Sequence, residues 1–169
     1  QGIMACARYQ RGPGGEGAEA GIRRHEYLHQ LLSGDPQQTK CLGLTDDERE
    51  GVEFAAEYVR LVAGQKPLEL ERPVYLLDDD FREISFGRAD VWAAPDLFDL
   101  KGSDEIDYEP QLAFYALALA RESCLETVYT HVMFWRTKTK VIRAYTLAQL
   151  QFIVGEVIAR QSDPTLPPT

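Results

Sequence analysis

The sequence predicts an α/β (α+β) fold, a central mixed β-sheet of about five strands flanked by helices. Apolar residues recur with a period of 3.6 near both ends of the chain and with a period of two in between, and the helix after Pro110 is apolar around most of its surface. The resulting order of elements is α-α-β-β-β-α-β-β-α. The 169 residues are enough for one hydrophobic core, so we expect a single domain spanning residues 1–169.

Two helices are predicted in the N-terminal third. Residues 1–17 are expected as a loop, because they end in the stretch QRGPGGEG. The first helix follows at about residues 18–32, and one face of it carries Ala18, Gly21, Ile22, His25, Leu28, His29 and Leu32. Its solvent side is expected to carry Arg23, Arg24 and Gln30. The second helix begins with a capping box of Thr45 and Glu48 and ends at Gly64.

Alternation of apolar and polar residues predicts five strands, at residues 69–77, 83–92, 96–101, 127–136 and 140–145. Pro73 indicates that the first strand is an edge strand or carries a bulge. The helix that enters near Pro110 is apolar around most of its surface, so we expect it to pack against the sheet. Thr146 and Gln149 cap the last helix, and residues 162–169 are expected as a disordered tail.

The composition restricts the classes of function. The chain has 27 acidic and 18 basic residues and a net charge of −9, which argues against generic coating of nucleic acid. It is compatible with an enzyme whose clustered carboxylates hold divalent cations. Three scattered cysteines (Cys6, Cys41 and Cys124) argue for a reducing compartment, so we expect a cytoplasmic protein. No membrane association is expected, because no apolar run is long enough to span a bilayer.

The stretch HEYLH at residues 25–29 fits the H-E-x-x-H pattern of zinc peptidases. A catalytic zinc needs a third protein ligand, and the extended motif fails because Leu32 replaces its glycine and Asp35 its last histidine. The alternative is that both histidines are ordinary helix residues facing the core. We favour that interpretation for His29, and a zinc peptidase is the least favoured function.

Asp90, Asp99 and Lys101 lie at the ends of two neighbouring predicted strands. Because strand side chains alternate, Asp99 and Lys101 point to one face and Leu100 to the other. The short turn AAP requires antiparallel pairing, which can bring the two carboxylates together. Two carboxylates on one face are costly unless a cation lies between them, and oxygen ligands suit Mg²⁺ or Mn²⁺. Lys101 would then hold or deprotonate a water beside the cation.

Gln111 and Tyr115 are polar residues on one face of an otherwise apolar helix, so they need partners. A site over the adjoining strand ends would supply them, although the two side chains could also bond within the core. Asp90 could likewise cap a turn, and Asp99 with Lys101 could be an ion pair on a solvated strand. The complete pattern, an acid, then acid-x-lysine, then Q-x-x-x-Y, is much more specific than any of its parts.

The pattern GRAD…DLFDLK…EPQLAFYALAL resembles the PD-(D/E)XK nuclease superfamily in its RecB-like branch, which includes phage-type and CRISPR-associated exonucleases. The stretch A-x-x-G-x-x-x-H, from Ala18 to His25, resembles the first motif of that branch. The resemblance covers the chain from about residue 18 to the last helix and implies a restriction-endonuclease-like core. Ala89 stands where the family name has a proline.

The resemblance also implies roles for individual residues. The implied metal ligands are His25, Asp90, Asp99 and the carbonyl oxygen of Leu100. The implied catalytic set is Asp90, Asp99, Lys101 and Gln111, with Lys101 as the catalytic lysine. Gln111 and Tyr115 would bind substrate by steadying the lysine or a DNA phosphate. Some relatives carry an iron–sulfur cluster, but no cysteine follows Cys124, so either the natural chain continues or, as we expect, no cluster is present.

The function implied is a metal-dependent deoxyribonuclease, an exonuclease of recombination, repair or phage DNA processing, with Mg²⁺ or Mn²⁺ as cofactor. Its partners would be DNA, single- or double-stranded, and a recombination or helicase protein. The alternative from a different class is a catalytically silent DNA-binding scaffold of a nuclease complex. An endonuclease and an RNA substrate remain open alternatives.

Overall fold

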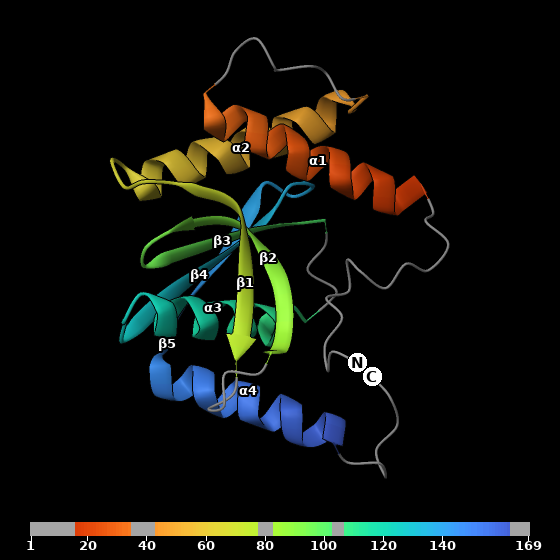
Figure 1. Ribbon diagram of the computed structural model, residues 1–169. Helices are drawn as coiled ribbons and strands as arrows, with labels where there is room; N and C mark the ends of the chain where they lie inside the picture. The colour runs from red at the N-terminus through yellow and green to blue at the C-terminus, as the bar shows by residue number, and fades with distance from the viewer. Residues whose placement is uncertain (1–15, 35–42, 78–82, 103–106, 163–169) are drawn as a thin grey trace.

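The computed structural model describes residues 16–34, 43–77, 83–102 and 107–162. It contains a five-stranded mixed sheet flanked by helices, so the predicted fold class is confirmed (Figure 1). The element order also matches the prediction: α1 (Glu16–Ser33), α2 (Asp46–Ala63), β1 (Glu69–Leu77), β2 (Glu83–Ala93), β3 (Asp96–Lys101), α3 (Glu109–Glu122), β4 (Thr127–Phe134), β5 (Thr139–Thr146) and α4 (Leu147–Ser162). Helix α1 thus begins two residues before the predicted start, and the predicted tail boundary is wrong by one residue, because Ser162 belongs to α4.

The strands lie in the sheet in chain order, from β1 to β5. β2 and β3 pair antiparallel across the short AAP link, as predicted. β3 and β4 are parallel, and α3 forms the crossover that this pairing needs. β1 is an edge strand, which explains how Pro73 is tolerated without a donor for the ladder.

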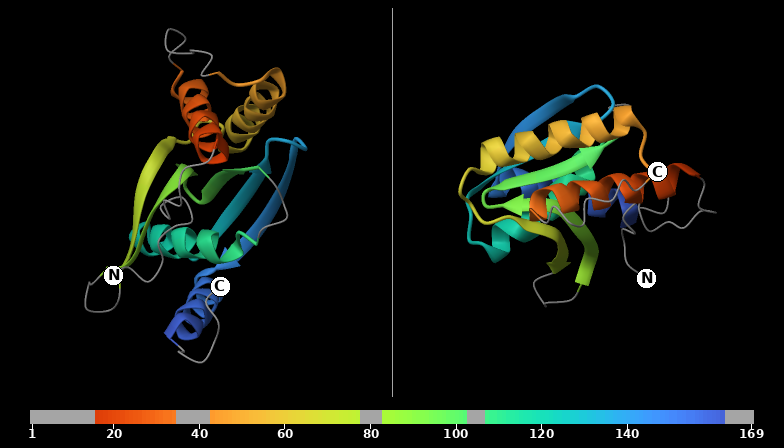
Figure 2. Two further views of the ribbon diagram at one scale, coloured as in Figure 1. Left: turned by 90° about the vertical axis from the view of Figure 1, so that its right-hand side faces the viewer. Right: turned by 90° about the horizontal axis from the view of Figure 1, so that it is seen from above.

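Two hydrophobic clusters lie on opposite faces of the sheet. One cluster joins α1 and α2 to Val91, Phe98 and Leu100, and the other joins α3 and α4 to Trp92 and Leu97. Figure 1 shows α1 and α2 above the sheet, α3 directly below it and α4 beneath α3, and the left view of Figure 2 shows the same layers from the side. The β2–β3 pair is therefore covered on both faces, which positions its polar residues between helices.

The predicted apolar face of α1 is partly wrong. Ile22 is 67% exposed and His29 is also exposed, whereas Tyr27 and Leu28 are buried. Arg24, expected on the solvent side, lies with its guanidinium carbon 4.6 Å from the centre of the Trp135 ring. The buried face of α1 is thus rotated toward Arg24, Tyr27 and Leu28, because packing on α2 and on Trp135 outweighs the apolar periodicity.

Both predicted capping boxes are present. In α2 the Thr45 side chain accepts a hydrogen bond from the Glu48 backbone, and the Glu48 side chain accepts one from the Thr45 backbone. Thr146 and Gln149 exchange the same pair of bonds at the start of α4. These bonds satisfy backbone N–H groups that have no partner within the helix, and they fix where each helix begins.

A buried polar network joins α2 to the sheet at the end of β3 opposite to Lys101. Nε2 of His131 lies 2.9 Å from Oδ1 of Asp96, and Nδ1 of His131 lies 2.8 Å from the hydroxyl of Tyr58. Because a carboxylate only accepts, Nε2 carries the proton, and Nδ1 accepts the hydroxyl proton of Tyr58. Lys66 donates to the other oxygen of Asp96 at 2.6 Å. Burial lowers the pKa of His131 despite the opposing effect of Asp96, so the folded protein favours the neutral ring.

This lowered pKa predicts a stability that falls in acid. Below about pH 6.5 the unfolded chain binds a proton at His131 that the folded chain still rejects, so unfolding becomes easier as the pH falls. We expect the free energy of unfolding, measured in urea at about pH 7.5 and 5.5, to fall more in the wild type than in His131→Gln. The difference is at most about 1.4 kcal/mol per pH unit. An equal fall in both proteins would contradict a neutral buried His131.

Candidate metal centre

The centre forms where β2 and β3 separate. Their ladder runs from Ala93 opposite Asp96 to Val91 opposite Phe98, and the next facing residues are Asp90 and Asp99. At this position the Asp90 side chain takes the place of a strand partner, because its Oδ2 accepts a hydrogen bond from the backbone N–H of Leu100 at 2.8 Å. Asp90 is 4% exposed and Asp99 2%. Both predicted acids thus lie buried at the opening between the two strands.

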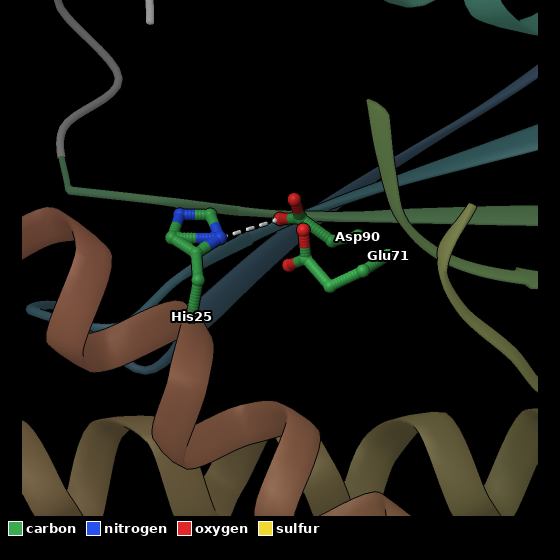
Figure 3. A group of neighbouring side chains, drawn as sticks. All are labelled: His25, Glu71 and Asp90. Carbon is green, nitrogen blue, oxygen red and sulfur yellow. Dashed lines mark ion pairs between the residues drawn. The ribbon is translucent and has the colours of Figure 1, made fainter. Parts of the chain in front are cut away.

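Helix α1 brings His25 to this opening. Nδ1 of His25 lies 3.1 Å from Oδ2 of Asp90 (Figure 3). Ligand atoms about 2.1 Å from one Mg²⁺ at right angles to each other are about 3.0 Å apart, so this separation suits a shared cation. The structure therefore brings together His25 and Asp90, two of the residues for which the family resemblance implies metal binding.

Glu71 of β1 is the third member of the group, and the sequence pattern did not predict it. One ligand atom each from His25, Glu71 and Asp90 lie within 4.8 Å of one another, and Figure 3 shows the two carboxylates side by side next to the imidazole. Leu70 pairs with Val91 and Arg72 with Ala89, so Glu71 stands opposite Asp90. Aligning the two predicted strands in this register would have placed the two acids together.

At the same position, the side chains of β1 change the face of the sheet to which they point. Glu71 has φ of 50°, a conformation that is uncommon for residues other than glycine. Leu70 packs in the cluster of α1 and α2, whereas Val74, an even number of residues later, packs in the cluster of α3. In β2, Ala89 packs in the cluster of α3, whereas Val91, two residues later, packs in the cluster of α1 and α2. Both strands therefore change faces at Glu71 and Asp90, a feature that strict alternation does not predict.

Lys101 lies in a second cluster, on the α3 side. Its Nζ is 2.8 Å from Oδ2 of Asp99 and donates to Oε1 of Gln111 at 3.2 Å. Nε2 of Gln111 donates to the hydroxyl of Tyr115 at 3.0 Å. The predicted acid-x-lysine and Q-x-x-x-Y residues thus form one chain of contacts. Gly87 permits it, because a Cβ there would lie 2.3 Å from the Tyr115 ring.

Asp99 does not belong to the group of His25, Glu71 and Asp90. Its contact with Lys101 holds it on the α3 side, and its role as a metal ligand stays a prediction. The carbonyl oxygen of Leu100 likewise stays a predicted ligand, while the Leu100 side chain is buried in the core as expected. A hollow of about 170 Å³ is lined by both His25 and Lys101, so the two clusters open into one space.

The H-E-x-x-H pattern does not assemble a metal pair. Among the described residues, the group of potential ligands contains His25 but neither His29 nor Glu26. His29 is exposed, so the expectation that it faces the core is wrong. Asp35, which occupies the last histidine position of the extended motif, lies outside the described residues. The arrangement of α1 thus favours His25 acting with carboxylates of the sheet.

Comparison with protein-family models and with curated proteins gives no match for this chain. Within the part of the chain that the structure describes, each helix is too short or too polar to cross a bilayer.

The geometry predicts that Glu71 contributes to cation binding. Glu71→Gln removes one negative charge and keeps the size of the side chain. We expect its affinity for Mn²⁺, measured by isothermal titration calorimetry without nucleic acid, to fall about tenfold or more, because even partners of metal ligands are worth 10–100-fold.

Glu69→Gln is the matched control. Both side chains belong to β1 and pair with an arginine, Glu69 with Arg72 and Glu71 with Arg88, but Glu69 lies outside the group of potential ligands. Glu69→Gln should bind Mn²⁺ as the wild type does. Equal affinities of the Glu71 and Glu69 variants would place Glu71 outside the coordination sphere.

Proposed function

We propose that the protein is a metal-dependent nuclease that hydrolyses the phosphodiester bonds of DNA. The observation that carries the proposal is the junction at Leu100. On one side, Asp90 contacts His25 and the Leu100 N–H. On the other, Lys101 contacts Asp99 and Gln111. A set of carboxylates and an imidazole next to a half-buried lysine is suited to hydrolysis at a phosphate and is not needed by a passive scaffold.

The donor set fits a hard divalent cation. The two carboxylates are oxygen donors that suit Mg²⁺ or Mn²⁺, and the imidazole adds a softer nitrogen donor, which favours Mn²⁺ over Mg²⁺. Such a cation would acidify a water and stabilise the charge that develops on the phosphate. His25, Glu71 and Asp90 would hold it, and Asp99 would complete the set from the neighbouring strand. Because a bound cation would neutralise this cluster of acids, a chain of net charge −9 could still act on an anionic substrate.

Lys101 would act on the attacking water or on the phosphate. Its Nζ lies between the Asp99 carboxylate and the Gln111 amide oxygen, so these two side chains hold the ammonium group in position. A lysine ammonium group that is already held in position needs no reorganisation when charge develops in the transition state. Gln111 is itself fixed by Tyr115, and both would act as positioning residues. A cytoplasmic location and a recombination or helicase partner are further parts of the proposal, which follow from the scattered cysteines and from the family resemblance.

A cleavage assay tests the proposed function. The substrates are end-labelled single-stranded and duplex DNA, with Mg²⁺, Mn²⁺ or EDTA. We expect cleavage with either cation and none in EDTA. Lys101→Ala should lower the rate about 10²–10³-fold, because it removes one charge contact of the transition state. Gln111→Ala should cause a smaller loss.

His25→Ala and His29→Ala form a matched pair on the same helix. The first should abolish cleavage and the second should leave it nearly unchanged, because only His25 contacts Asp90. Equal rates for wild type and Lys101→Ala would contradict the mechanism and favour the DNA-binding scaffold. Loss of all cleavage in His29→Ala would instead indicate that His25 and His29 hold the ion together, as in the H-E-x-x-H motif.

A further inference from the structure

A larger hollow lies beyond Lys101, between the beginning of α3 and the strands β4 and β5. Its volume is about 400 Å³, at the lower end of the range for sites that bind small organic groups. Leu112, Val132 and Phe134 form its apolar floor, and Val141 lies at its open edge on β5. We call it the α3–β5 groove.

The groove adjoins the proposed catalytic residues. Tyr108 lines the groove, and the centre of its ring lies 4.8 Å from Nζ of Lys101. The hollow beside His25 is also lined by Lys101. The two hollows thus flank Lys101, one toward His25 and the other toward β5. A strand whose phosphate lies at Lys101 could therefore place its next base in the groove.

The polar groups of the groove favour a base over a phosphate. Asp107 and Glu109 line it, and carboxylates repel a phosphate. Oε1 of Glu109 accepts from Arg143 at 2.7 Å and from the Tyr145 hydroxyl at 2.6 Å, so the carboxylate is held in place. An oriented carboxylate above an apolar floor suits the amino and imino donors of a planar base.

The charge of the surrounding hairpin favours an anionic chain outside the groove. Between residues 127 and 155 there is no Asp or Glu, although the protein as a whole has a net charge of −9. The same segment contains four basic residues, which are Arg136, Lys138, Lys140 and Arg143. All four are exposed. Arg143 lines the groove and pairs with Glu109, whereas Lys138 pairs with Glu50 and Lys140 lies over the Tyr58 ring of α2. The hairpin as a whole therefore favours an anionic chain, and Arg143 is the member of this basic set that reaches the groove.

We infer that the α3–β5 groove binds one unpaired nucleobase of the strand being cut, so that the substrate is single-stranded DNA or a frayed end. The inference rests on the proposed nuclease function. A base inside a duplex is stacked and paired and cannot enter a hollow of this size, whereas an unpaired base can stack on an aromatic side chain such as Tyr108.

The experiment measures binding without cleavage. Fluorescence anisotropy in EDTA compares a labelled single-stranded 12-mer, an abasic chain of the same length, and a blunt 12-base-pair duplex. Val141→Glu and Val141→Gln obstruct the groove with a charged and a neutral side chain. Ile142→Glu is the matched control, because Ile142 is similarly exposed (51% against 43%) and points to the opposite face of β5.

We expect the wild type to bind the single strand at least about tenfold more tightly than the abasic chain, as base stacking typically provides. Both Val141 variants should lose most of this difference, while Ile142→Glu keeps it. All variants should melt within a few degrees of the wild type by circular dichroism, since both positions are exposed.

Three outcomes would overturn the inference. The first is equal affinity for the single strand and the abasic chain. The second is an effect of Val141→Glu without one of Val141→Gln, which would place a phosphate in the groove. The third is equally tight duplex binding that depends on Val141. Because EDTA removes the cation, these binding results are independent of cleavage. If the groove binds bases but the protein shows no cleavage in the nuclease assay, only the proposed hydrolysis is contradicted.

Discussion

The hydrogen bond from the Leu100 N–H to Asp90 holds the candidate centre together. A carboxylate that is 4% exposed is tolerated only if hydrogen bonds replace its lost hydration. The bond at 2.8 Å does so, and it also satisfies a backbone group that the diverging β2–β3 ladder leaves without a strand partner. Because Leu100 lies between Asp99 and Lys101, the same bond sets the distance between the group of His25 and the group of Lys101.

The two faces of the sheet contribute different chemistry to this junction. Helix α1 packs on α2 and presents His25, and α3 packs on the opposite face and presents Gln111 and Tyr115. Neither helix could reach both groups. The change of faces at Glu71 and Asp90 is therefore essential, since it lets two strands that line the α3 core direct their carboxylates toward α1. The cost is an uncommon backbone conformation at Glu71, which is typical of functional sites.

Much of the fold could be predicted because its determinants are local. Capping boxes, Pro73 and the period of two each report on a few neighbouring residues. The caps and the edge position of Pro73 agree with the structure, and the period of two locates the strands although it breaks at Glu71 and Asp90. The prediction for α1 failed at His29 and Ile22, because contacts with α2 and Trp135 set its orientation. Glu71 was missed for a related reason: its place opposite Asp90 depends on strand register and on a positive φ, which neither its neighbours nor its residue type specify.

The contacts that let the buried acids fold without a cation would also determine how strongly a cation binds there. Asp90 is compensated by His25 and the Leu100 N–H, and Asp99 by Lys101. These acids therefore do not depend on a cation for burial, unlike a cage of uncompensated carboxylates. A cation held by both side chains would replace the direct interaction between Nδ1 of His25 and Oδ2 of Asp90, while the two atoms could stay about 3 Å apart as its ligands. In the proposed nuclease, part of the binding energy of the cation would be spent on replacing this interaction, so we expect weak, reversible loading.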